Sequence, residues 1–525
     1  MTLTTIATNG ATRRRAPQSI SAAAVRSEPP LGLITLTVML GTVMAVIDTS
    51  IVNVALDTIG GNLGASIDDI GWVSTGYILS QVIVMPLNGW LTARFGRRNF
   101  YAASLAVFTL ASFMCGTASD IWQLVFYRVI QGIGGGALQP VAQAILMESY
   151  PPERRASALA MFGLGALVGP AIGPVLGGLF IDNYSWPLIF YVNVPIGIVA
   201  FVMTMLYIRD SAHAQRDRSP IDVIALALLA TGLGALQYVL ERGQRLDWFS
   251  SGQIVILTIV SVVALAAFVI RELRDRHPLV DLRVFASRAF SAGNVISVVS
   301  GFGLYGTALI LPLFLQNVLG FTPTDAGLAL VPGSIATMVS LQCASQVMRF
   351  ADARIVLAAG LAIFAAGAWW MGSLNQYAGY WDVFWPRVLQ GFALGFLFVP
   401  LSTTTLAEVS NERMAGASGI YNLVRQLGGS LGIAVLIFLQ TRFEDTAQSG
   451  LASSVTLANP NVANALHHGL RASQLYAIVV TNSTVISYDM VLRLCGIVFA
   501  LSIPLVLLLT VRRSASHATE TALEL

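Results

Sequence analysis

An all-α polytopic membrane protein is what this sequence predicts, and three observations support the prediction. Only 11% of the residues are charged and 55% are hydrophobic, whereas roughly a quarter of the residues of a soluble protein are charged. Apolar runs of about 20 residues, enough to cross a bilayer as a helix, recur along the chain. Two regions of the chain also match each other at a fixed spacing. Together these observations leave no room for a large soluble domain.

We expect fourteen transmembrane helices. Their expected starts lie near Leu31, Ile70, Asn99, Ile121, Arg155, Ser185, Ile221, Gly252, Phe290, Asp325, Ile355, Trp381, Met414 and Met490. No small-residue cleavage site follows the first apolar run, so we interpret that run as a retained helix and not as a signal peptide. The connections are short except for residues 440–488, a polar stretch that we expect to form a long loop before the last helix.

The arginines predict the orientation of these helices. All 30 basic residues are arginine, and most of them fall in loops that lie inside if the N-terminal tail, 1–30, is cytoplasmic. The few that fall outside are Arg242, Arg245, Arg442 and Arg471. Because cytoplasmic loops carry an excess of basic residues, we expect both tails, 1–30 and 512–525, in the cytoplasm. The 440–488 loop is then external.

An internal repeat divides the chain into two halves. The stretch "RVIQG" from Arg128 returns as "RVLQG" from Arg387, an offset of 259 residues, and the same offset pairs Gly169 with Gly428. The expected units are a six-helix half over 31–210, an insertion of two helices over 220–270 and a second six-helix half over 288–511. Transporters with two parallel repeats bind their substrate between the repeats, near the middle of the membrane.

Asp48 is a carboxylate within the first apolar run, "GTVMAVIDTSIVNVAL". It lies about 25 Å along that helix at the α-helical rise, and an ionised carboxylate there costs roughly 3 kcal/mol on insertion scales. Burial favours the neutral form of a carboxyl group and a nearby arginine favours the charged form. With Arg128 as counter-charge, Asp48 could take up and release a proton or attract a cationic substrate. A purely structural hydrogen-bonded role is the alternative.

Each of the other polar residues in the spans has two possible roles. Arg128 either takes part in coupling or pairs with a backbone carbonyl or Gln131. Asn53, Gln131, Gln316 and Asn422 either line a substrate cavity or hydrogen-bond within the helix bundle.

Four stretches then point to a family: "IDTSIVNVAL" from Ile47, "GWLTARFGRR" from Gly89, "RVIQGIGGGALQP" from Arg128 and "GPAIGPVLGG" from Gly169. Together they resemble the major facilitator superfamily, and within it the fourteen-span drug:proton antiporter branch of the EmrB/QacA type, closer to EmrB. The resemblance implies a major facilitator fold of two six-helix halves plus two inserted helices, in the bacterial inner membrane.

The resemblance also assigns roles to two motifs. In the gating loop Gly89, Arg94, Gly96 and Arg97 match, but Ala93 stands where the family has an aspartate. The antiporter motif, which marks exporters, is matched by Gly169, Pro170, Gly173, Pro174, Gly177 and Gly178. Because proline removes a backbone donor and glycine allows close approach, we expect this helix to bend and to seat against the opposite half.

The leading functional hypothesis is therefore a proton-coupled multidrug exporter of amphipathic compounds, and the alternative is a dedicated exporter of an endogenous metabolite or fatty acid. The expected partners are protons, substrates, membrane lipids and a periplasmic adaptor protein that docks on the external loop; a free surface loop is the alternative reading of that segment. We expect no enzyme activity, cofactor, metal or nucleic acid. The spans carry no nucleophile–base or metal-ligand constellation, and the absence of lysine excludes a GxxxxGK[ST] nucleotide loop.

Overall fold

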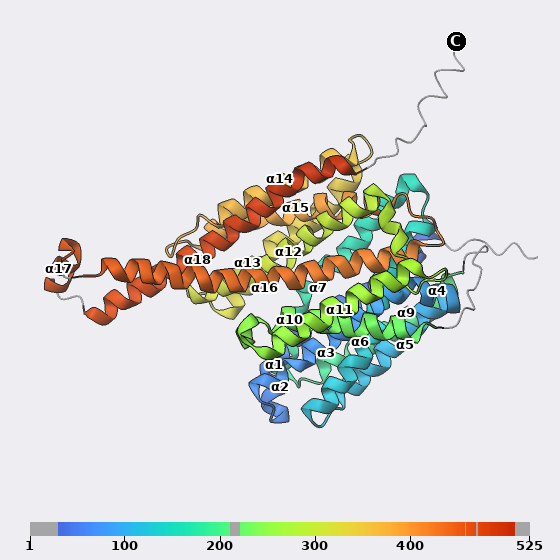
Figure 1. Cartoon of the computed structure of the whole chain (residues 1–525), viewed down its shortest axis with the longest axis horizontal. Helices are drawn as coiled ribbons and strands as arrows, with labels where there is room; N and C mark the ends of the chain where they lie inside the picture. The colour runs from blue at the N-terminus through green and yellow to red at the C-terminus, as the bar shows by residue number, and fades with distance from the viewer. Residues whose placement is uncertain (1–29, 211–220, 457, 469–470, 510–525) are drawn as a thin grey trace, which may run out of the picture.

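The computed structural model describes residues 30–210, 221–456, 458–468 and 471–509. Long helices run side by side along the molecule, with α4 at one end of the bundle and α17 at the other (Figure 1). In the described part, 11 helices are long and apolar enough to cross a membrane. The predicted tails, 1–30 and 512–525, lie outside the described residues apart from Pro30.

The first half corresponds to six expected spans, two of them broken. Its helices are α1 (Leu31–Leu63), α2 (Ile67–Ile70), α3 (Trp72–Val84), α4 (Asn88–Phe95), α5 (Arg97–Gly116), α6 (Ile121–Ser149), α7 (Arg155–Asn183), α8 (Leu188–Tyr191) and α9 (Asn193–Tyr207). A 3-10 turn at Met85–Leu87 separates α3 from α4. That turn contains Pro86, which cannot donate a backbone hydrogen bond.

Helix α6 lies at the centre of this half because its glycines allow close packing on both sides. A Cβ atom on Gly134 would lie 2.7 Å from the backbone oxygen of Ser104 on α5, and one on Gly136 would lie 2.8 Å from that of Gln81 on α3. The helix begins at an N-cap, Asp120, which accepts from the backbone N–H of Gln123 at 2.9 Å. These glycines therefore let α3 and α5 approach the α6 backbone closely.

The second half repeats the packing of the first. Its helices are α12 (Arg288–Asn317), α13 (Pro323–Val347), α14 (Ala353–Met371), α15 (Tyr380–Leu406), α16 (Met414–Ser454), α17 (Pro460–His467) and α18 (Ala472–Ser502). Helix α1 packs on α7 as α12 packs on α16, and α3 packs on α6 as α13 packs on α15. These pairings are the ones that a duplicated unit predicts.

The two inserted helices, α10 (Val223–Arg242) and α11 (Gly252–Arg274), form a hairpin beside the halves. The hydroxyl of Ser261 donates to the backbone oxygen of Gly232 at 2.9 Å and joins the two helices. Asp222 caps α10 and accepts from Arg271 of α11 at 2.6 Å, and this hydrogen bond lowers the pKa of the Asp222 carboxyl. Gln237 of α10 donates to Ser430 of α16 at 2.9 Å and so ties the hairpin to the second half.

The segment 440–488 differs from the expected loop. Helix α16 continues to Ser454, and α18 begins at Ala472, well before the expected start near Met490. The two helices project beyond the bundle toward α17 (Figure 1). Their polar side chains join them, since Thr484 donates to Glu444 at 2.6 Å. A helix with a polar face gives no continuous apolar run, which is why the hydropathy pattern did not reveal it.

Candidate functional site

A buried ion pair forms the centre of the first half. Nη1 of Arg128 on α6 lies 2.6 Å from Oδ2 of Asp48 on α1, and the two side chains are 1% and 0% exposed. Nε of Arg128 also donates to the backbone oxygen of Val73 on α3 at 3.1 Å, and Nη1 donates to Oε1 of Gln131 at 2.6 Å. The sequence offered Asp48, a backbone carbonyl and Gln131 as partners of Arg128, and in the structure Arg128 contacts all three.

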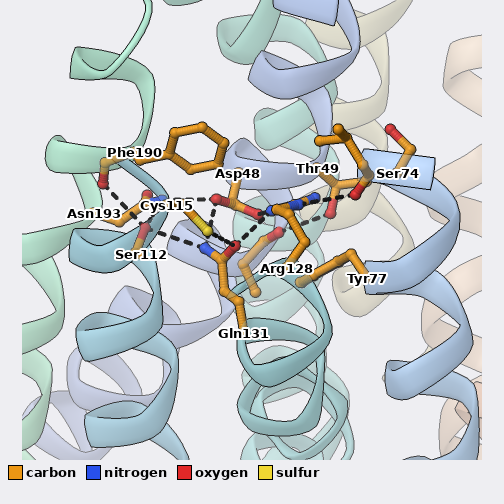
Figure 2. A network of polar contacts seen from close by, with 12 residues as sticks. Asp48, Thr49, Ser74, Tyr77, Ser112, Cys115, Arg128, Gln131, Phe190 and Asn193 are labelled. Carbon is orange, nitrogen blue, oxygen red and sulfur yellow. Dashed lines mark hydrogen bonds and ion pairs between the residues drawn. The ribbon is translucent and has the colours of Figure 1, made fainter. Parts of the chain in front are cut away.

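Amide and hydroxyl groups complete the surroundings of Asp48 (Figure 2). Its Oδ1 accepts from Nε2 of Gln131 at 2.8 Å and from Nδ2 of Asn193 at 2.9 Å. Both amides also donate to the hydroxyl of Ser112 on α5, at 3.1 and 3.0 Å. Four helices, α1, α5, α6 and α9, thus meet at one carboxylate, and every group that contacts its oxygens is a donor.

Aromatic rings cover the guanidinium. The central carbon of Arg128 lies 4.2 Å from the ring centroid of Tyr77 and 5.8 Å from that of Phe190. Rings attract a cation through their negatively charged faces and exclude water at the same time. The cluster is overall neutral, and its burial requires a near-complete set of hydrogen bonds, because a buried charge without partners costs several kcal/mol.

Helix α7 lies against α13 and α15 of the opposite half, as expected, but the glycines of its motif face α1 in its own half. A Cβ atom on Gly169 would overlap Val46 of α1, and one on Gly173 would overlap Ser50 of α1. Gly177 also faces α1, at Ile51, whereas Gly178 has nothing within 4 Å of a Cβ. The motif therefore holds α7 against the helix that carries Asp48. The side chains of Pro170 and Pro174 lie outside the described part of the structure.

The gating loop lies at one end of the bundle, called the basic end below. Gly96 has φ of +84° at the turn from α4 into α5, a conformation that glycine adopts readily. Arg97 forms an ion pair with Glu148 at the end of α6, and the Arg94 guanidinium carbon lies 5.5 Å from the ring centroid of Trp90. A Cβ atom on Gly89 would lie 2.8 Å from Cα of Gly416, at the start of α16 in the other half.

The two halves also meet through amide groups. Nδ2 of Asn422 on α16 donates to Oε1 of Gln143 on α6 at 2.8 Å, and Asn422 is 2% exposed. Ala93 stands in place of the family's aspartate, and near the basic end the halves meet through glycine packing, this neutral hydrogen bond and apolar residues such as Met85 and Ile420. Phe162 of α7 stacks on Phe398 of α15, with ring centroids 6.1 Å apart, and extends the contact.

The remaining candidates lie apart from the Asp48 cluster. Asn53 is exposed on α1 and accepts from the hydroxyl of Ser74 at 3.0 Å. Gln316 is half-buried near the end of α12. The cluster residues that sequence reasoning missed are Ser112 and Asn193; Asn193 stands in "FYVNVPIG", and a polar residue inside a span is the signal that could have found both.

Comparisons with known proteins agree with this architecture. The family described as Major Facilitator Superfamily matches residues 38–433. The chain is 39% identical over 432 residues to the multidrug export protein EmrB of Escherichia coli strain K12, covering 82% of this chain and 84% of EmrB. It is 36% identical over 427 residues to the fatty acid resistance protein FarB of Neisseria gonorrhoeae, covering 81% of this chain and 84% of FarB.

Solved structures of the same fold are more distant in sequence. The human organic anion transporter MFSD10 superposes with a TM-score of 0.60 at 12% identity, covering 91% of this chain and 100% of that one. The proton:xylose symporter XylE superposes with a TM-score of 0.57 at 14% identity, covering 89% and 94%. With its duplicated halves, the match over residues 38–433 and its relation to the EmrB exporters, the chain belongs to the major facilitator superfamily.

Proposed function

We propose that the chain is a proton-coupled exporter of amphipathic or hydrophobic compounds that works by alternating access. Its similarity to multidrug export proteins over four fifths of the chain supports export as the direction of transport. The observation that best supports proton coupling is the Asp48 cluster, in which an acidic side chain is surrounded by residues from several helices.

The geometry links proton uptake to motion. Asp48 accepts three hydrogen bonds at 2.6–2.9 Å, from Arg128, Gln131 and Asn193. In this proposal, proton uptake at Asp48 loosens these contacts. Since these residues belong to α6 and α9, protonation of Asp48 on α1 requires a rearrangement within the first half. Such a rearrangement alters the surface that the first half presents to the second.

The contacts between the halves indicate on which side of the membrane the transporter is closed. Gly89 meets Gly416, and Asn422 meets Gln143, in the part of the bundle toward the basic end. If the basic end is cytoplasmic, as the arginines predict, this state is closed toward the cytoplasm. Loss of these contacts would open the path to the cytoplasm, as alternating access requires.

Export of a fatty acid or related metabolite is the second candidate, and the similarity to FarB favours it. For localisation we propose the bacterial inner membrane, with lipids around the bundle. The projecting parts of α16 and α18 enclose an apolar groove with α17, lined by Ala452, Val455, Val462, Leu466 and Leu475. This groove is our proposed docking surface for a periplasmic adaptor.

Efflux of a fluorescent amphipathic dye from cells, or its uptake into inverted vesicles, tests the proposal. Export should require an imposed proton gradient and stop when an uncoupler dissipates it. Uphill efflux that continues without a gradient, or that requires nucleotide, would contradict proton coupling.

A further inference from the structure

Arg425 of α16 lies between the two halves of the protein. Its Nη2 donates to Oδ1 of Asn422 at 2.8 Å and to Oε1 of Gln139 at 3.3 Å. Gln139 belongs to α6 in the first half, so the guanidinium bridges the halves. The guanidinium carbon also lies 5.4 Å from the ring centroid of Phe398 on α15, and the side chain is only 9% exposed.

The duplication places this guanidinium near the axis that relates the halves. Gln139 and Phe398 are equivalent positions, since the offset of 259 residues that relates Arg128 to Arg387 also relates them. Equivalent positions approach each other only near the axis of symmetry, and Arg425 contacts both. At the α-helical rise it lies about 16 Å from the start of α16, which is about half of a hydrocarbon layer ~30 Å thick. Transporters built from such repeats bind substrate at this level.

No carboxylate neutralises Arg425 within the described residues. Both of its hydrogen-bond acceptors are neutral amide oxygens, and none of the ion pairs in the described ranges includes it. Asp48 is already paired with Arg128. A cation buried in a membrane protein without a counter-charge is costly, and neutral hydrogen bonds offset only part of that cost.

A second observation also indicates that a negatively charged partner is missing beside Arg425. Nε2 of Gln143 is buried without a hydrogen-bond partner, and the other end of that amide accepts from Asn422, which in turn accepts from Arg425. An unpaired cation and an unpaired N–H donor therefore belong to one connected group. Both lack an acceptor that carries negative charge, and an anion would supply it.

In the second half, the position equivalent to Asp48 carries no acid. Thr307 occupies the position equivalent to Asp48, and its hydroxyl donates to the backbone of its own helix at 2.6 Å. Arg387, the equivalent of Arg128, has an unpartnered Nε and a long 3.5 Å contact to Gln390. The duplicated units have thus diverged, and Arg387 faces no carboxylate at the position equivalent to Asp48.

We propose that Arg425 is the counter-ion for an anionic group of the exported compound, so that the central site selects amphipathic carboxylates. This inference rests on the proposed export function and deepens it by naming the substrate class. Arg425 supplies charged donors for the carboxylate, and the ring of Phe398 beside its guanidinium supplies an apolar surface for the rest of the molecule.

Equilibrium binding to the purified full chain tests the inference with a matched pair of probes, a dansyl-labelled undecanoic acid and its carboxamide. The parent should bind the acid at least tenfold more tightly than the amide, since a charge-assisted hydrogen bond contributes about 1.4 kcal/mol or more. Arg425→Gln should remove this preference, and Arg425→Lys should retain part of it.

Gln139→Glu provides a variant that keeps the arginine in place. The new carboxylate would lie about as far from Nη2 of Arg425 as the amide oxygen does, 3.3 Å, and would neutralise it internally. Binding of the acid should fall about tenfold, as expected for loss of one charged partner, while binding of the amide stays unchanged. Gln123→Glu adds the same charge to the outer part of the same helix and should change neither.

The outcomes separate the inference from the function on which it rests. Equal binding of acid and amide by the parent, or equal loss of both probes in Gln139→Glu, would overturn the anion site while gradient-driven dye export survives. If the parent binds neither probe and exports no dye under a gradient, the proposed function fails and the anion site fails with it.

Discussion

Asp48 and Arg128 lie 80 positions apart in the chain, yet Oδ2 of one and Nη1 of the other are 2.6 Å apart. Neither side chain is accessible to solvent beyond 1%. The pair therefore places a carboxylate and its counter-charge in direct contact, buried inside one half of the transporter.

Asp48→Asn should abolish proton-coupled efflux of every substrate and leave insertion intact. Asparagine keeps the size of the side chain and its amide oxygen, but it cannot titrate. The measurement is uphill efflux of one cationic and one neutral compound in vesicles, with Asp48→Glu as the titratable control that should keep some activity. If Asp48 only attracts cations, the neutral compound will still be exported. Full activity toward both compounds would indicate a structural carboxylate.

Arg128→Gln should destabilise the protein by about 3–5 kcal/mol, because it leaves a buried carboxylate without its counter-charge. We expect a lower melting temperature and a lower yield of folded protein. The double variant Asp48→Asn/Arg128→Gln should recover most of the stability but not the transport. A double variant no more stable than Arg128→Gln alone would argue against the pair as the source of the loss.

Gly173→Ala should impair transport by separating α7 from α1. Its Cβ would overlap Ser50, and overpacking of this kind costs about 1–3 kcal/mol. Gly178→Ala adds the same methyl group in the same helix where nothing lies within 4 Å, so it should behave like the parent. The comparison uses dye efflux at equal expression. Equal activity of the two variants would remove the packing role of the motif.

Gly419→Ala should favour opening at the basic end. Its Cβ would overlap the backbone oxygen of Met85 in the first half, so the closed contact between the halves is lost. Spin labels at Phe95 and Glu412, both exposed, should show a longer mean distance in this variant, in a background with the native cysteines replaced. Gly450→Ala, where a Cβ meets nothing within 4 Å, is the control. An unchanged distance distribution would exclude this glycine contact as part of the closure.

The amino-acid sequence by itself determined the membrane-protein class, the duplication and the approximate spans, except for the start of the last one. These follow from local properties: about 20 apolar residues in a row must form a helix in a bilayer, since every backbone polar group needs a partner there. The sequence also identified Asp48 and Arg128, because a charge within such a run stands out whatever its neighbours are.

Only the tertiary structure decided which groups these charges meet. Ser112 and Asn193 come from other helices, and small polar residues in a span carry no pattern that indicates the partner they contact. Packing also decided that the Gly173 face lies on α1 and not on the opposite half, since a glycine permits close approach without specifying the helix that approaches. The position of Arg425 between Gln139 and Phe398 depends likewise on how two distant halves assemble, and assembly is a property of complementary surfaces, not of local sequence.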